Sequence, residues 1–305
     1  MRQILINPSK TDAPMVYNSG QFKMKKYLFV LSALVLFAFS SCKKIAGDPI
    51  TQNFSVGGNY TELEVQNAFD VTVNDAATEI TVTAGKNVMP NVKVENVGGK
   101  LKIYLKPAIN ISGLNEMKVT LPYNANLTSV DLSGASEFHS SYRLEGPRVE
   151  VELSGASDFY CDIAADEVDI DLSGASDFYG DILADDIDMD LSGASNIKGN
   201  VLANELDLDL TGASDATLVG AVSTLKINLA GASNIIKQVV GNSYALVCDG
   251  CEGVMSGASE AYIHCDGRIC VDLSGASHLH YTGDGSSSGC STTSGGSSIS
   301  GPEHP

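Results

Sequence analysis

The chain has 305 residues, of which 43% are apolar, and it contains 30 glycines and no tryptophan. This is enough for one or two domains with a real core. The formal net charge is −18 at pH 7, from 19 basic and 37 acidic residues. Phosphate binding needs clustered lysine and arginine, so this charge excludes nucleic acid and leaves cations, basic surfaces and neutral glycans as partners.

Residues 1–41 are predicted to be an upstream extension and a signal peptide. Two lysines at positions 25 and 26 precede an apolar run over residues 27–39, and two serines follow. A charged start, a short apolar segment and small residues in this order are typical of a secretory signal. Met24 opens the Met-Lys-Lys sequence usual for such signals, so the true start is Met1 or Met24.

Cys42 directly follows the small residues, an arrangement that resembles a bacterial lipobox. We therefore expect Cys42 to be lipidated and residues 42–53 to form a lipid-anchored linker. The predicted location is the cell envelope, anchored to the outer membrane on its periplasmic or its surface face. A plain signal peptide is the alternative, followed by a retained transmembrane helix, for which the apolar run is short.

The tripeptide Gly-Ala-Ser recurs through the second half of the chain. Five consecutive members, from Gly155 to Gly231, are separated by a constant step of 19 residues. A constant step indicates that one structural unit is stacked repeatedly, with its glycines forming a ladder of turns. The glycines of this ladder are Gly134, Gly155, Gly174, Gly193, Gly212, Gly231, Gly257 and Gly275.

A strictly alternating segment precedes each glycine, as in Val-Asp-Ile-Asp-Leu-Ser over residues 168–173. Such alternation defines a half-buried strand, with aliphatic side chains on one face and aspartate and serine on the other. One unit cannot bury its apolar face alone, so units must stack about 4.8 Å apart with equivalent residues in register. The sequence therefore predicts an all-β fold, a parallel β-helix (β-solenoid) with about 19 residues per coil. Its core is expected to be narrow and aliphatic, with columns such as Val151, Ile170, Met189, Leu208 and Ile227.

The β-helix domain is predicted to span residues 54–283. Residues 54–128 alternate less regularly and are expected to form atypical N-terminal coils, with a hairpin-like turn at 96–100. Residues 129–283 hold the Gly-Ala-Ser repeats. Serine and glycine dominate after them, so residues 284–305 are predicted to be a flexible tail or to add one weak final strand.

Several segments together resemble a known family. They are Leu-Glu-Val at 63–65, Phe-Asp-Val-Thr-Val at 69–73, Lys-Leu-Lys-Ile at 100–103, the serial Leu-Ser-Gly-Ala-Ser motifs, and Ser-His-Leu-His-Tyr-Thr-Gly at 277–283. In this order they are similar to the putative auto-transporter adhesin, or head GIN domain, of Bacteroidota envelope lipoproteins. The resemblance covers roughly residues 54–301 and implies a right-handed β-helix on a secreted or lipid-anchored protein. It carries over no catalytic residue.

Three columns of polar side chains are predicted on the outer surface. A hydroxyl column stands two residues after each glycine, from Ser136 to Ser277. An acidic column stands three residues before the glycine and holds Asp131, Glu152, Asp171, Asp190 and Asp209. A second acidic column stands three residues after it and includes Asp158, Asp177 and Asp215.

Stacked carboxylates repel one another, so these columns invite two interpretations. In the first, Ca²⁺, which prefers oxygen ligands, bridges neighbouring carboxylates. In the second, which we favour, the charge keeps a strand-rich surface soluble and discourages sideways aggregation. No Gly-Gly-x-Gly-x-Asp calcium repeat is present in the sequence. We expect no other cofactor.

Six cysteines follow Cys42, and four of them are predicted to meet on neighbouring coils. Their offsets from the ladder glycines bring Cys248 near Cys265 and Cys251 near Cys270. Disulfides at these two places suit an exported protein. A four-thiolate zinc site and free thiols are the alternatives.

The predicted function is a non-catalytic envelope lipoprotein with an adhesin-like binding surface or a scaffolding role. Its partners are expected to be the membrane, through the lipid anchor, and glycans or another envelope or host protein. The alternative is a polysaccharide-active β-helix enzyme, a lyase or a hydrolase, because two carboxylates at a suitable distance are enough for glycoside hydrolysis. The five histidines match no nucleophile or metal motif and are expected at the surface or at corners.

Overall fold

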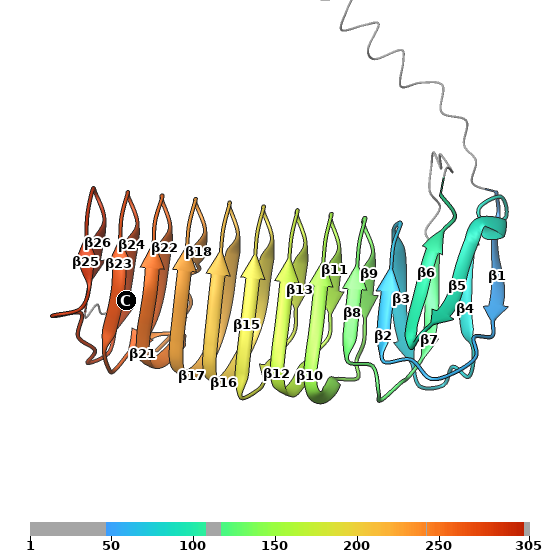
Figure 1. Cartoon of the computed structure of the whole chain (residues 1–305), viewed down its shortest axis with the longest axis horizontal. Coiled ribbons are helices and arrows are strands. Elements are labelled where there is room, and N and C mark those ends of the chain that lie inside the picture. The colour runs from blue at the N-terminus through green and yellow to red at the C-terminus, as the bar shows by residue number, and fades with distance from the viewer. Residues whose placement is uncertain (1–46, 108–116, 242, 302–305) are drawn as a thin grey trace, which may run out of the picture. The chain divides into compact units, whose positions relative to one another are not determined.

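The computed structural model describes residues 47–107, 117–241 and 243–301. These residues form a β-solenoid whose coils stack along one axis, with parallel strands of successive coils side by side (Figure 1). One short 3₁₀ helix, Met89–Asn91, is the helical element of the described part. The predicted fold class is thereby confirmed.

Each coil has two main faces that meet at the Gly-Ala-Ser corner. The face before the corner, called the pre-corner face, contains β2 (Glu62–Val65), β5 (Val92–Val97), β6 (Lys100–Leu105), β8 (Ser129–Leu132), β10 (Leu144–Leu153), β12 (Ile163–Leu172), β15 (Asp186–Leu191), β21 (Leu246–Met255), β23 (Ile269–Leu273) and β25 (Thr292–Thr293).

The face after the corner, called the post-corner face, contains β1 (Pro49–Phe54), β3 (Phe69–Asn74), β4 (Ile80–Gly85), β7 (Met117–Pro122), β9 (Glu137–His139), β11 (Asp158–Tyr160), β13 (Asp177–Tyr179), β18 (Asn234–Ile235), β22 (Glu260–Cys265), β24 (His278–Thr282) and β26 (Ser298–Ser300). The long strands β16 (Asn196–Leu210) and β17 (Asp215–Leu229) continue across both faces. β14 (Ile182–Leu183) lies on a narrow third side.

The register of the stacked coils follows the 19-residue repeat. Between β12 and β15, Ile170 lies opposite Met189 and Asp171 lies opposite Asp190. The predicted aliphatic columns are therefore real, and their members are buried. The core is not purely aliphatic, however, because Phe138, Phe159 and Phe178 stack inside it with ring centroids 5.0–5.3 Å apart.

The corner positions require glycine, because there is no space for a side chain. Gly193 has a φ of +80°, and a Cβ placed on it would lie 2.3 Å from the carbonyl oxygen of Gly174. The corners are joined along the axis by backbone hydrogen bonds, such as Ala194 N–H to Gly174 O at 2.8 Å. Asn67, with φ +74°, and Gly295, with φ +71°, extend this ladder at its two ends.

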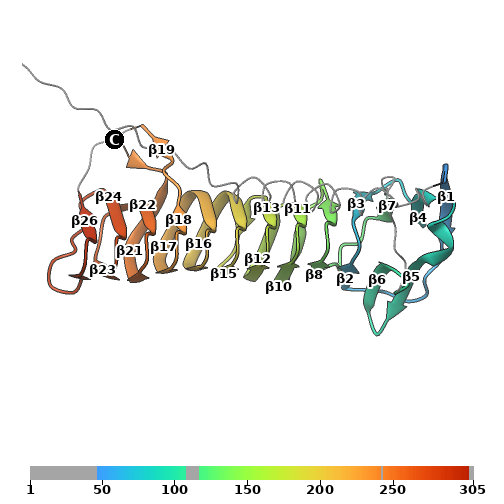
Figure 2. The same ribbon diagram turned by 90° about the horizontal axis from the view of Figure 1, so that it is seen from above.

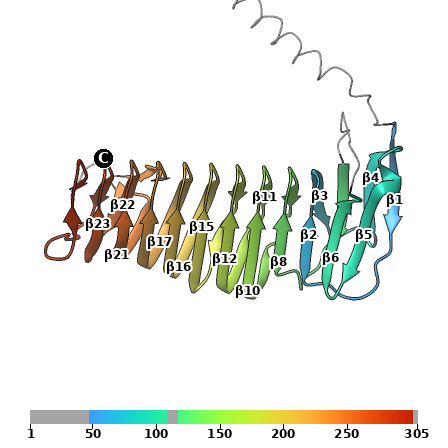
Figure 3. The same ribbon diagram turned by 45° about the horizontal axis from the view of Figure 1, so that its top comes forward.

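The N-terminal region, residues 49–122, combines less regular parallel coils with antiparallel strands, and we call it the cap. β2 lies between β6 and β8 (Figure 3). β3 lies between β7 and β9, and all four pairings are parallel. The chain then leaves the stack and returns, and β1, β4 and β5 pair antiparallel with their neighbours. The predicted turn at 96–100 is the hairpin between β5 and β6. The predicted linker 42–53 is wrong at its end, because β1 already begins at Pro49.

At the other end the structure continues past the predicted boundary at residue 283. β25 pairs with β23 and β26 pairs with β24, so the serine- and glycine-rich segment forms a further coil. A small hairpin of β19 (Val239–Val240) and β20 (Ser243–Tyr244) projects to one side (Figure 2). It accounts for the longer step between Gly231 and Gly257.

Candidate functional site

The most distinctive surface of the molecule is the outer side of the pre-corner face. The predicted acidic column is present here, since Asp131, Glu152, Asp171, Asp190 and Asp209 lie opposite one another in successive strands. In-register parallel stacking places each carboxylate next to its equivalent in the next coil. The column therefore forms a continuous row of negative charge.

Two further acidic columns lie beside the first, and their residues were not among the predicted ligand residues. The alternation that positions Asp171 and Asp190 also directs the residues two and four places earlier to the same side. We call the three columns together the acidic face. Its members are Asp131, Glu150, Glu152, Glu167, Asp169, Asp171, Asp186, Asp188, Asp190, Glu205, Asp207 and Asp209.

Basic side chains stand at both margins of the acidic face. Arg148 contacts Glu167 and Asp169 at one side, and Lys226 contacts Glu205 at the other. In the cap, Lys102 Nζ lies 2.6 Å from Glu64, which is opposite Asp131 in the register. The carboxylates between these margins face mainly other carboxylates.

This crowding changes the acidity of several groups. Partial burial, followed by repulsion from Glu152 and Glu64, raises the pKa of Asp131 from 3.8 to about 6. Burial and the neighbouring aspartates also raise the pKa values of Asp188 and Asp190. Each carboxylate costs its neighbours free energy when it ionises.

The acidic face is slightly hollowed along the predicted column. A shallow groove of about 460 Å³ is lined by acidic and hydroxyl side chains together with two leucines. Its lining is Glu152, Asp171, Leu172, Ser173, Asp190, Leu191, Ser192, Asp209 and Thr211. The groove runs across several coils, so a ligand lying in it would contact the same chemical groups repeatedly.

The second predicted acidic column lies on the post-corner face, around the corner from the first. Asp158 and Asp177 are opposite each other, and Asp215 lies opposite Asn196. Asparagine relieves the charge here: Asn196 donates a hydrogen bond of 2.7 Å to Asp177. The eight predicted ligand residues therefore form two separate columns and not one site.

The predicted outward column of serines is wrong. Ser136, Ser157, Ser176 and their equivalents through Ser277 are fully buried. Each hydroxyl donates to the carbonyl oxygen three residues earlier, as Ser176 does to Ser173 at 2.9 Å. The corner rotates the chain, so the serine points inward and satisfies a backbone group instead of meeting a ligand.

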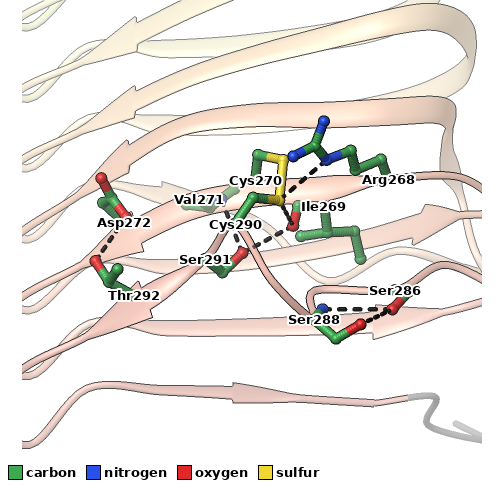
Figure 4. Close-up of a disulfide and its surroundings, with 10 residues drawn as sticks. All are labelled: Arg268, Ile269, Cys270, Val271, Asp272, Ser286, Ser288, Cys290, Ser291 and Thr292. Carbon is green, nitrogen blue, oxygen red and sulfur yellow. Dashed lines mark hydrogen bonds between the residues drawn. A yellow bond between two sulfur atoms is a disulfide. The ribbon is translucent and has the colours of Figure 1, made fainter.

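The cysteines are arranged differently from the prediction. Cys270 is bonded to Cys290 and not to Cys251, and this disulfide joins the last two coils (Figure 4). Cys251 is buried and lies opposite Ile269, while Cys270 lies opposite Glu252, so the two cysteines point to opposite faces of the strands. A four-thiolate zinc site would need Cys270 beside the other three thiols, so this arrangement also excludes that alternative.

Cys248 and Cys265 do lie opposite each other, as predicted, and both are free thiols. A hydrogen bond between them raises the pKa of Cys248 and lowers that of Cys265. A disulfide between these two residues stays a prediction.

Cys42 and the predicted signal peptide lie outside the described residues. In the part of the chain that the structure covers, no helix has the length and apolar character needed to cross a membrane.

Comparisons with known proteins agree with this architecture. A solved structure of a putative adhesin from Parabacteroides distasonis has a TM-score of 0.61 at 17% identity, covering 83% of this chain and 98% of that one. A putative adhesin from Parabacteroides merdae also has a TM-score of 0.61, at 15% identity and 83% and 96% coverage. A putative lipid binding protein from Parabacteroides distasonis has a TM-score of 0.59, at 19% identity and 84% and 98% coverage.

At these identities the likeness concerns the fold. No curated protein matches the chain. The model of a family described as putative auto-transporter adhesin, head GIN domain, matches residues 59–202 and 177–285. The matched segments cover most of the sequence, and the chain therefore belongs to the head GIN domain family of putative auto-transporter adhesins.

Proposed function

We propose that this protein is a non-catalytic lipoprotein of the cell envelope that binds its partner through the acidic face. The observation that carries this proposal is the unbroken register of carboxylates from Asp131 to Asp209. A partner with regularly spaced donors could form the same weak contact at every coil, and many weak contacts together give tight binding.

The chemistry of the face narrows the class of partner. Carboxylates accept hydrogen bonds from hydroxyl groups and attract ammonium and guanidinium groups. A repeating glycan or a basic protein surface would meet this requirement. Anionic lipid head groups would be repelled by a chain of net charge −18, so a lipid surface is the less favoured partner.

Two triple variants test whether the acidic face carries the binding. The first changes Asp171, Asp190 and Asp209 to asparagine on the acidic face. The matched control changes Asp158, Asp177 and Asp215 to asparagine on the post-corner face. Both remove three negative charges, so they differ only in the face that is neutralised.

The purified chain would be applied to a glycan array and to a panel of envelope proteins, and each hit measured with both variants. We expect the first variant to lose binding and the control to keep it. Equal loss in both would show that binding depends on overall charge and not on this face. Depolymerisation of a bound polysaccharide by the unchanged chain would favour the alternative, a polysaccharide-active enzyme.

The anchor is tested in cells. We expect Cys42→Ser to release the protein from the membrane fraction, since lipidation requires this thiol. Protease treatment of intact cells then reports whether the solenoid stands on the outside, which binding to an external partner requires. Membrane retention of the Cys42→Ser variant would contradict the lipid anchor.

A further inference from the structure

A histidine and two carboxylates meet on the post-corner face, where the cap joins the regular coils. Asp70 is on β3, and Glu137 and His139 are on β9. One donor atom from each residue lies within 4.8 Å of the other two. His139 Nε2 is 3.2 Å from Glu137 Oε2 and 3.9 Å from Asp70 Oδ1.

The fold explains why these side chains converge. Glu137 and His139 are two residues apart on one strand, so they point to the same side. The parallel pairing of β3 with β9 places Asp70 opposite Glu137. The three residues are brought together although 67 positions separate Asp70 from Glu137.

Aromatic stacking restricts the plane of the His139 imidazole ring. It stacks on the ring of Tyr160 in the next coil, with centroids 4.6 Å apart and planes 5° apart. Stacking of this kind continues to Tyr179. In this ring orientation Nε2 is directed towards the two carboxylates.

Other coils of the same two columns lack this combination. The equivalent positions in the next coils hold Asp158 with Tyr160 and Asp177 with Tyr179. Near the C-terminal end, His280 Nε2 lies 3.4 Å from the carboxylate of Glu260. His280 and Glu260 are not part of a three-residue cluster of this kind among the described residues, and they serve as the comparison.

We propose that Asp70, Glu137 and His139 form a binding site for a divalent transition metal ion, for which Zn²⁺ is the test ion. One imidazole nitrogen and two carboxylate oxygens are ligands that Zn²⁺ accepts at about 2.0–2.2 Å. The present donor separations allow an ion to be reached by small side-chain rotations. Three protein ligands leave a coordination position open to water or to an oxygen atom of a partner.

Of the surrounding charged side chains, one favours binding of a cation and one opposes it. Asp158 lies next to Glu137 in the same column, and its negative charge favours a bound cation. Lys118 lies opposite Asp70 on the other side of β3, and its positive charge opposes one. A metal ion here would connect β3 to β9, and thus the cap to the body, independently of the binding proposed for the acidic face.

The test is isothermal titration calorimetry. The full chain is first freed of metal with a chelator and is then titrated with ZnCl₂. We expect one ion per chain and a reduction in affinity of at least about tenfold for His139→Ala and for Asp70→Asn. His280→Ala is the matched control and should bind like the unchanged chain. Lys118→Met should bind more tightly, a gain that a merely damaged fold would not produce.

Thermal unfolding without metal verifies that each variant is folded. The proposal is overturned if the unchanged chain does not bind Zn²⁺ at millimolar concentration. It is also overturned if His139→Ala leaves the affinity unchanged, because the ion would then be bound elsewhere, for instance at the buried thiols.

Discussion

In the acidic columns of both faces, most carboxylates lie opposite another carboxylate in a neighbouring coil. Where asparagine replaces one member, repulsion becomes a hydrogen bond: Asn228 donates to Asp209 at 2.8 Å and Asn234 donates to Asp215 at 2.8 Å. Each kind of acidic column therefore contains a position at which asparagine replaces charge repulsion by a hydrogen bond. Charge at the remaining positions costs stability, which is the expected signature of a surface kept for binding or for solubility.

Asp190→Asn should stabilise the protein. Asp190 lies between Asp171 and Asp209, and burial together with the neighbouring aspartates raises its pKa. Replacing it should remove two repulsions and raise the free energy of unfolding by about 0.5 kcal/mol at low salt. Urea denaturation at low and high salt measures this, and the gain should shrink as salt is added.

The control for this prediction is Asp266→Asn. Asp266 accepts a hydrogen bond of 3.1 Å from the backbone N–H of Asp284, and this bond lowers its pKa. Its neutralisation should not stabilise the protein. A loss of stability in Asp190→Asn would contradict the repulsion argument.

Asp131 should make stability depend on pH. Its pKa of about 6 in the folded protein is higher than the ordinary value of 3.8, so the folded state binds this proton more tightly than the unfolded chain does. The free energy of unfolding should therefore fall as the pH rises from about 4 to about 6. Allowing for its half-exposed position, we expect a difference of about 1 kcal/mol.

The comparison is Asp131→Asn, which cannot titrate. Denaturation curves of both proteins across this pH range should diverge towards neutral pH, with the variant the more stable. Parallel pH profiles would show that Asp131 titrates normally.

The inward serines show a limit of sequence reasoning at this scale. Alternation correctly predicts which side chains of a strand point outward and which point inward, as for Asp171 and Leu172. It fails at the corner, because the positive φ of Gly174 turns the chain before Ser176 is reached. The motif alone does not reveal that rotation.

At the scale of the element, the corner ladder is the most constrained feature. Gly193→Ala should destabilise the protein by about 2–4 kcal/mol, because a Cβ would meet the carbonyl oxygen of Gly174 at 2.3 Å and the backbone conformation is unfavourable for alanine. Thermal unfolding measures the loss. Gly57→Ala is the control, since a Cβ at that position would have no neighbouring atom within 4 Å. Equal melting temperatures would show that the corner can relax.

The last coil should depend on its disulfide. β25 and β26 have little buried apolar surface, and Cys270–Cys290 closes a loop with a sequence separation of 20 residues. A bridge of this span contributes about 3 kcal/mol in the chain-entropy model. The double variant Cys270→Ser, Cys290→Ser should therefore lose hydrogen-exchange protection in residues 292–300.

Reduction of the unchanged protein should have the same effect, and reducing agent should change nothing in the double variant. Undiminished protection in β25 and β26 would show that backbone pairing alone holds this coil.

The strands of the repeat were predictable because one unit recurs at a fixed step, which specifies the register without any structure. The arrangement of the cap was not predictable, because its strands leave the stack and return. As a result β2, which precedes both in the chain, lies between β6 and β8. The disulfide was missed for a similar reason. Its partner Cys290 belongs to a coil whose corner reads Ser-Gly-Gly-Ser, so the Gly-Ala-Ser pattern does not mark it.

At the scale of the whole molecule, charge is distributed by face and not evenly. Twelve carboxylates gather on the acidic face, whereas the asparagines and stacked rings of the post-corner face dilute its charge. The candidate metal residues were missed because Asp70 belongs to the cap, and its position beside β9 depends on the return of the chain. Long-range topology of this kind leaves no local signal in a single sequence.

Calcium should act on this molecule as a counterion and not as a ligand held in a cage. Ca²⁺ takes six to eight oxygen ligands. The acidic face supplies one carboxylate per column and coil on a flat sheet, and it brings no backbone carbonyl towards an ion, because the strand carbonyls are used in the ladder. We therefore expect millimolar Ca²⁺ and Mg²⁺ to raise the melting temperature equally, with the rise following ionic strength. A saturable increase specific to Ca²⁺, lost in the Asp171, Asp190 and Asp209 triple variant but not in its matched control, would instead establish bridging between coils.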